Sequence, residues 1–249
     1  MIYFFRALSA EQLKLKRSLA MWMVLIAPLA VCFLYLMIML KTPESYYGPS
    51  AWEGEIKSIL SMWSVMMLPL YITLETALTA NSEHNNQIWK YLYALPIPRW
   101  SIFSAKWVMN LFLVLSSSVV CFILTIGAGI VMRYVFPETG FVHNFPWTYA
   151  LTVNGKVFLA SLFIISIHTW ISLNWKNIII AIGSGMVAAV GNLTIMMSEK
   201  WGAIFPWTLP FYAYAVEDVN LIQIYAIALG GSLLFAIFGS FWLSKKQIF

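Results

Sequence analysis

Long apolar blocks separated by short polar segments make up most of the chain. Six blocks stand out, at 19–40, 59–80, 108–132, 157–173, 178–197 and 221–243. A helix that crosses a bilayer needs about 20 apolar residues, with a range of about 17–25. Backbone groups in lipid must hydrogen-bond within their own segment, and the blocks show no strand alternation, so each predicts a helix. We expect an all-α membrane protein with six transmembrane helices in one domain spanning residues 1–249.

The composition supports a membrane protein and excludes a soluble domain. The 249 residues are 61% hydrophobic and 10% charged, whereas soluble domains carry about 25% charged residues. The net charge of +5 does not predict nucleic-acid binding, because the basic residues are spread along the flanks of the apolar blocks. Cys32 and Cys121 both lie inside apolar blocks, where free cysteines usually serve packing.

Basic residues predict the orientation, since cytoplasmic loops of membrane proteins are enriched in Lys and Arg. If the N-terminus lies inside, ten of the 15 basic residues fall on the cytoplasmic side, and both termini are cytoplasmic. Most acidic residues, Glu55 among them, are then placed in outer segments. The outer segment 198–220 is rich in aromatic residues and proline, and it predicts a short re-entrant or lateral helix pair.

Residues 1–18 predict an amphipathic helix that lies in the membrane interface. An apolar face and a basic face alternate with a helical period, as in helices that lie on a membrane surface. The alternative is a basic flank that only enforces topology. The apolar face consists of Phe4, Phe5, Leu8, Leu15 and Leu19, and the basic face of Arg6, Lys14, Lys16 and Arg17.

The segment 81–107 is the longest polar interruption on the predicted cytoplasmic side. Ser82 is a candidate N-cap for a short helix from Glu83 to Ala94, which Pro96 and Pro98 would end. The segment contains Glu83, an amphipathic stretch with Trp89, Lys90 and Tyr91, the sequence Leu95-Pro96-x-Pro98-Arg99, and Lys106 at the start of the third block. A structured segment here indicates a contact with a cytoplasmic partner, whereas an ordinary basic loop is the simpler alternative.

Motifs for catalysis, nucleotide binding and metal binding are absent from the sequence. It has no G-x-x-x-x-G-K-[ST], no H-E-x-x-H and no G-x-S-x-G. Its three histidines are far apart, so no metal site is expected. Glu75 is the one acid inside a predicted span; it either bonds to a neighbouring helix, Lys106 or Lys90, or serves coupling or substrate contact. His168, also in a span, is read as a packing residue before a ligand.

The polar segment resembles that of the type-2 ABC transporter permeases. An acid (Glu83), a short helix, the Leu95-Pro96-x-Pro98-Arg99 turn and a following lysine (Lys106) carry the resemblance. The basic N-terminus is similar to the interfacial elbow helix of that family. Asn85-Asn86-Gln87 stands where the family usually has Gly-Thr. The short chain looks most like the lantibiotic or bacteriocin immunity exporters.

This resemblance implies a permease of an ATP-driven exporter in the plasma membrane of a prokaryote, with no enzymatic activity of its own. It implies as partners a cytoplasmic ABC ATPase dimer, a second permease subunit and membrane lipid, with no nucleic acid. The chain would hold no cofactor, and ATP and Mg would bind the ATPase. The coupling residues would be Glu83, Trp89, Lys90, Tyr91, Pro96, Arg99 and Lys106. An ATPase-independent immunity or scaffold protein that acts by binding is the alternative.

Overall fold

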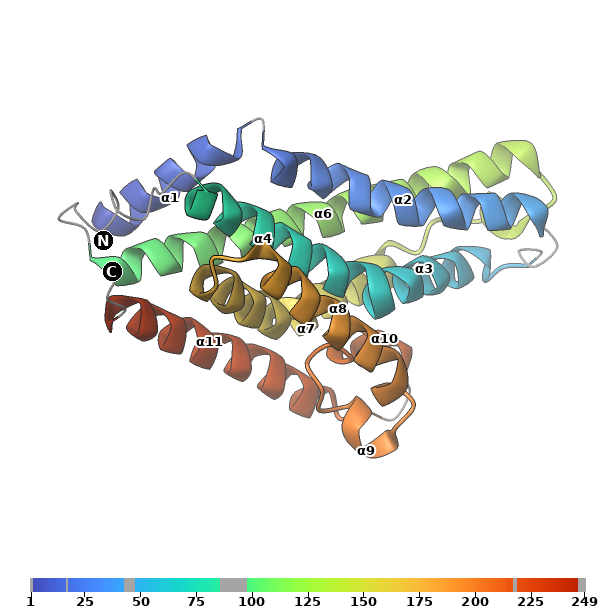
Figure 1. The fold of residues 1–249 in the computed structure, drawn as a ribbon. Helices are drawn as coiled ribbons and strands as arrows, with labels where there is room; N and C mark the ends of the chain where they lie inside the picture. The colour runs from blue at the N-terminus through green and yellow to red at the C-terminus, as the bar shows by residue number, and fades with distance from the viewer. Residues whose placement is uncertain (1, 17, 43–47, 86–97, 217–218, 246–249) are drawn as a thin grey trace.

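A computed structural model describes residues 2–16, 18–42, 48–85, 98–216 and 219–245 (Figure 1). These residues form helices and no strand. The helices are α1 (Ile2–Leu15), α2 (Leu19–Lys41), α3 (Ala51–Met62), the π-helix η2 (Trp63–Met67), α4 (Leu68–Asn85), α6 (Arg99–Val135), the 3₁₀-helix η3 (Gly140–Val142), α7 (Trp147–Asn174), α8 (Ile178–Ile195), α9 (Glu199–Gly202), α10 (Leu209–Ala215) and α11 (Leu221–Lys245).

The six expected spans are confirmed: six helical segments in the described residues are long and apolar enough to cross a membrane. Three extend well beyond the apolar blocks. The second runs over Ala51–His84 through α3, η2 and α4, the third over Arg99–Val135, and the fourth begins at Trp147. The predicted blocks end where the first polar residues interrupt the apolar sequence. Helical periodicity continues past those residues, since an amphipathic end still buries one face.

Glu55 shows the difference most clearly: we expected it in the outer segment before the second block, and it lies instead in the long second helical segment Ala51–His84. It lies in α3 on a buried face with Trp52, Ile56 and Ile59. The Glu55 side chain packs so closely on Gly129 of α6 that a Cβ there would lie 2.7 Å from Oε2. Neither carboxylate oxygen of Glu55 has a hydrogen-bond partner among the described residues.

The bundle has one end where most of the expected cytoplasmic features meet. The start of α1, the end of α4, the start of α6 and the end of α11 lie together there, as expected for an even number of spans (Figure 1). We call this the charged end. α7 packs against α4, α6, α10 and α11. Residues 198–216 contain two short helices, α9 and α10, and α10 packs on α7.

The second span accommodates a proline through a side chain from another helix. Pro69 has no N–H, so it cannot donate to the carbonyl of Val65 one helical turn earlier. The chain forms the π-helix Trp63–Met67 just before this proline. Asn192 of α8 donates from Nδ2 to that Val65 carbonyl at 2.6 Å. Such replacement partners are what allow proline within membrane helices.

Two glycines of α11 differ in their surroundings and provide a test of the packing. A Cβ on Gly239 would lie 2.2 Å from Cζ of Phe103, whereas a Cβ on Gly230 meets nothing within 4 Å. The Phe103 ring is held in a buried cluster with Leu173 and Leu243, so it cannot easily move aside.

We therefore expect Gly239→Ala to lower the free energy of unfolding by about 1–3 kcal/mol through overpacking. Gly230→Ala is the matched control and should raise that free energy by up to about 1 kcal/mol, because alanine favours helix. Unfolding temperatures in one detergent measure both changes. Equal shifts for the two variants would contradict the packing of α11 on α6.

Candidate functional site

Four charged side chains meet at the charged end and form what we call the ion cluster: Glu11, Lys14, Glu83 and Lys106. Lys106 Nζ lies 2.8 Å from Glu11 Oε2 and 2.9 Å from Glu83 Oε1. Lys14 Nζ lies 2.7 Å from Glu11 Oε1 and 2.5 Å from Glu83 Oε1. Each cation thus contacts both carboxylates, and the formal charges cancel.

The ion cluster joins three helices that are far apart in the sequence. Glu11 and Lys14 come from α1, Glu83 from the last turn of α4 and Lys106 from the second turn of α6. Glu83, Lys106 and Glu11 are buried, while Lys14 is partly exposed. Removing one partner of a buried ion pair typically costs about 3–5 kcal/mol, because it leaves a buried charge without compensation. The cluster therefore fixes α1 against the last turn of α4 and the first turns of α6.

An apolar layer packs directly beneath the ion cluster. Leu15 of α1 contacts a buried group formed by Ala20 and Val24 of α2 and Met109 and Leu113 of α6. These apolar side chains leave little room for water on the side of the cluster that faces α2. Ion pairs are screened less where water is excluded, so the attraction within the cluster is stronger. The expected face of α1 is accordingly corrected: Glu11 lies on its buried side and Lys14 at its margin, while Phe5 is exposed.

A polar seam lies deeper in the bundle, between α4, α6 and α7. Asn110 of α6 accepts from Thr79 Oγ1 at 3.2 Å and donates to Thr169 Oγ1 at 3.0 Å. Ser172 of α7 donates to Thr76 Oγ1 at 3.2 Å. Hydrogen bonds between membrane helices contribute about 0.6 kcal/mol each on average. The seam thus links α4 and α6, which carry Glu83 and Lys106 of the ion cluster, to α7.

The expected coupling residues separate into three groups. Glu83 and Lys106 meet in the ion cluster. Arg99 lies elsewhere at the charged end, where its Nη1 donates to the carbonyl of Ser244 at 3.4 Å. The residues Trp89, Lys90, Tyr91 and Pro96 lie outside the described residues. Ser82 does not start a new helix: it lies within α4 and donates to the Thr79 carbonyl at 3.0 Å.

Glu75 and His168, the two polar candidates within spans, are both buried. Neither carboxylate oxygen of Glu75 has a hydrogen-bond partner among the described residues, so the expected pairing with Lys106 is wrong. Lys106 instead binds Glu83 and Glu11, which lie at the charged end. The alternative partner, Lys90, lies outside the described residues. His168 Nε2 lies 3.4 Å from Thr73 Oγ1, and its ring meets Trp207 edge-on.

Glu11 is the site residue that sequence reasoning missed. A signal was present: Glu11 continues the row of Phe4, Leu8 and Leu15 at helical spacing, so it shares their face. It also precedes Lys14 by three residues, which brings the two side chains together on a helix. Among the described residues, no group of three or more His, Cys, Asp or Glu could hold a metal ion.

The family of the chain follows from comparison with known families. A family model described as ABC-2 family transporter protein matches residues 7–192, well over half of the chain. The chain belongs to the ABC-2 transporter family. All four residues of the ion cluster lie within the matched range, whereas α9, α10 and α11 lie beyond it. Comparisons with curated proteins and with solved structures found no match.

Membership of the ABC-2 family identifies the chain as a membrane component of a transporter. Such components are generally not catalytic themselves, and their family implies an ABC ATPase as partner. The six apolar helices agree with a multi-pass membrane protein. Two residues of the ion cluster, Glu83 and Lys106, lie on the helices that precede and follow residues 86–97.

Two glutamates of α4 allow a matched test of the ion cluster. We expect Glu83→Met to lower the free energy of unfolding by about 3–5 kcal/mol, because Lys106 and Lys14 lose a buried partner. The same change at Glu75 removes a buried carboxylate without a hydrogen-bond partner, so Glu75→Met should raise it by about 1–3 kcal/mol. Thermal unfolding in detergent measures both. A comparable loss in the two variants would refute the assignment of the cluster.

Acid should weaken the ion cluster through Glu11. Burial acts to raise the pKa of the Glu11 carboxyl, but the ammonium groups of Lys106 and Lys14 outweigh it and lower that pKa below its ordinary value. A carboxylate with a lowered folded pKa stabilises the fold above its unfolded pKa, about 4.3, and this stabilisation is lost as the pH falls through the folded pKa.

We expect the unfolding temperature of the chain to fall as the pH is lowered from about 5. Glu11→Gln should flatten this dependence, because residue 11 no longer titrates. Glu138→Gln is the control, since Glu138 is exposed and follows α6 at the opposite end. Differential scanning fluorimetry across the pH range provides the measurement. An unchanged slope in Glu11→Gln would argue against ionised Glu11 as a stabilising group.

Proposed function

We propose that the chain is the permease subunit of an ATP-driven exporter. It would move a hydrophobic or amphipathic substrate, such as a lantibiotic or bacteriocin peptide or a drug, out of the cell or the membrane by alternating access. The charged end would face the cytoplasm of a prokaryotic cell, with both termini on that side. A dimer of ATPase subunits would bind ATP and Mg there, and a second permease subunit, identical or related, would complete the pathway.

The observation that carries this proposal is the position of the ion cluster. Residues 86–97 connect α4 to α6, and the cluster lies at both ends of this connection: Glu83 comes three residues before it and Lys106 nine residues after it. A force on the connection would reach α4 and α6 directly, and Glu11 and Lys14 would transmit it to α1. The three helices would move together rather than singly.

The bundle also offers a way to turn this force into a change of access. Packed interfaces switch between discrete arrangements more readily than they deform. In the polar seam, α6 is bonded to α7 through Asn110 and Thr169, and α4 through Thr76 and Ser172. These single hydrogen bonds between side chains are weak compared with the ion cluster. Movement of the α1–α4–α6 unit would therefore break the seam first. ATP binding by the partner would bias the equilibrium between the two arrangements.

The nature of the substrate is proposed from the outer surface of the bundle. α8 and α11 are the least buried spans and expose many large apolar side chains, Val187, Ile222 and Leu234 among them. Such faces contact lipid or a second permease, and a substrate that passes along them should itself be apolar or amphipathic. A bacteriocin peptide meets this requirement, and the fit rests on chemical likeness alone.

Substitutions in the α4–α6 connection test the proposal. Trp89→Ala and Tyr91→Ala should lower substrate-stimulated ATPase activity about tenfold, as expected when aromatic residues at the centre of an interface are truncated. Both variants should still insert and fold. The measurement uses the chain co-purified with its ATPase and reconstituted in liposomes.

Tyr134→Ala is the matched control, because Tyr134 is an exposed aromatic residue at the opposite end of α6. It should leave the stimulated ATPase activity unchanged. A tagged chain purified in mild detergent should also retain a stoichiometric P-loop ATPase, identified by mass spectrometry. Recovery of the chain alone after crosslinking in the native membrane would reject the exporter and favour a protein that acts by binding.

A further inference from the structure

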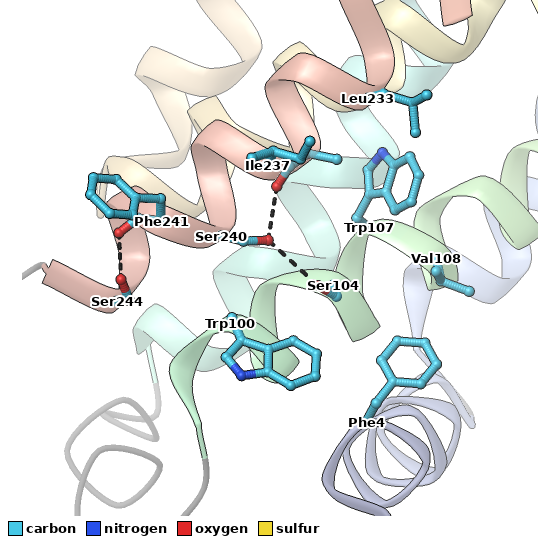
Figure 2. A pocket seen from close by; sticks show the side chains of 11 residues that line it. Phe4, Trp100, Ser104, Trp107, Val108, Leu233, Ile237, Ser240, Phe241 and Ser244 are labelled. Carbon is cyan, nitrogen blue, oxygen red and sulfur yellow. Dashed lines mark hydrogen bonds between the residues drawn. The ribbon is translucent and has the colours of Figure 1, made fainter. Parts of the chain in front are cut away.

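A groove runs along the outside of the bundle near the charged end (Figure 2). Its volume is about 700 Å³, and residues of α1, α6 and α11 line it. Phe4 of α1 stands on one side, Trp100 and Trp107 come from α6, and Ile237 and Phe241 come from α11. Ile237 is 69% exposed and Phe241 57% exposed. The groove therefore opens sideways, toward the lipid that surrounds a membrane helix.

The wall of the groove offers little to a polar ligand. Its serine hydroxyls already bond within the protein: Ser240 donates to the Ala236 carbonyl at 2.8 Å, and Ser244 to the Phe241 carbonyl at 2.6 Å. Ser104 Oγ lies 3.4 Å from Ser240 Oγ. The remaining lining is aromatic and aliphatic. Such a wall suits a hydrocarbon chain, because apolar surface is stabilised when it leaves water or replaces it.

Two cations lie at the end of the groove that the start of α6 and the end of α11 form. Arg99 contacts the carbonyl of Ser244, a lining residue, at 3.4 Å. Lys245 Nζ lies 4.3 Å from the ring centre of Phe241, another lining residue. Planar guanidinium groups suit bidentate binding of phosphate. Basic sites between membrane helices on the cytoplasmic side bind anionic lipid headgroups.

We propose that this groove binds one anionic phospholipid of the leaflet at the charged end. An acyl chain would lie against Trp107, Ile237 and Phe4, and the phosphate would lie between Arg99 and Lys245. A dry wall with two cations at its outer end matches the two parts of this molecule. The lipid would contact the start of α1 while the ion cluster holds its end, so lipid charge would affect how firmly α1 is seated.

The site does not depend on the exporter function, and the test reads lipid binding alone. The purified full chain is mixed with phosphatidylglycerol and phosphatidylcholine of identical acyl chains, and native mass spectrometry counts the bound lipids. We expect phosphatidylglycerol to bind about tenfold more tightly, as two nearby cations favour an anionic headgroup. A diazirine at the end of the acyl chain should label peptides that contain Trp107 or Ile237.

Three variants separate the two parts of the site. Arg99→Gln with Lys245→Gln should abolish the preference for phosphatidylglycerol but keep the labelling. Ile237→Trp should narrow the groove and lower labelling by both lipids. Lys41→Gln removes an exposed cation at the last residue of α2, far from the charged end, and should change neither readout.

Equal binding of the two lipids by the unaltered chain would overturn the proposal, as would a preference that survives loss of both cations. Ile237→Cys gives a further check in native membranes. Efficient disulfide formation between two copies at this position would show that the groove faces a second subunit, which would also overturn it. No disulfide, together with labelling by the lipid, supports it.

Discussion

The buried four-charge cluster is the constraint on which the charged end of the molecule depends. Two carboxylates and two ammonium groups contact each other in all four opposite-sign combinations, at 2.5–2.9 Å. Because each charge has two partners, none is left as a buried monopole. Moving any one of α1, α4 and α6 away from the other two helices would break two of these contacts at once. The three helices are thus one mechanical unit.

The rest of the bundle is held by weaker and more adaptable contacts. Asn192 compensates for the N–H that Pro69 lacks, and Asn110 bonds to both α4 and α7. The buried carboxylates differ in whether a cation lies beside them. Glu83 is buried with two cations, whereas Glu55 and Glu75 are buried without a hydrogen-bond partner among the described residues. Ionisable groups in that second situation are costly in a membrane and are retained where they serve function.

Much of this architecture could be predicted from hydropathy. The apolar blocks predict six helices, and the charge bias predicts that the first and last described helices meet at the same end of the bundle. The amphipathic pattern of the first residues predicts a helix before the first span. The extents of the spans could not be predicted in the same way. Ala51–Met62 contains three charged residues and fails a test of bulk hydropathy, although its buried face repeats with helical period.

Only two of the four residues of the ion cluster could be predicted as site residues, because the others lie far from them along the chain. Glu83 and Lys106 flank one polar segment, and this position predicts a role for both at the site. Glu11 lies 95 residues from Lys106 along the chain, and no local pattern places α1 beside α6. The sequence also does not show which carboxylate pairs with Lys106. Glu75 was a plausible partner by sequence, but Glu83 and Glu11 hold that cation in the folded chain.

A charge-reversal series tests the central claim that these four residues form one network. If Glu83 and Lys106 were an isolated pair, exchanging the two by Glu83→Lys with Lys106→Glu would restore stability. In a network, that exchange sets the new ammonium group at position 83 against Lys14 and the new carboxylate at position 106 against Glu11. We predict that the double exchange is as unstable as either single change. Reversal of all four charges, by adding Glu11→Lys and Lys14→Glu, should recover most of the unfolding temperature. Full recovery in the double exchange would contradict the network.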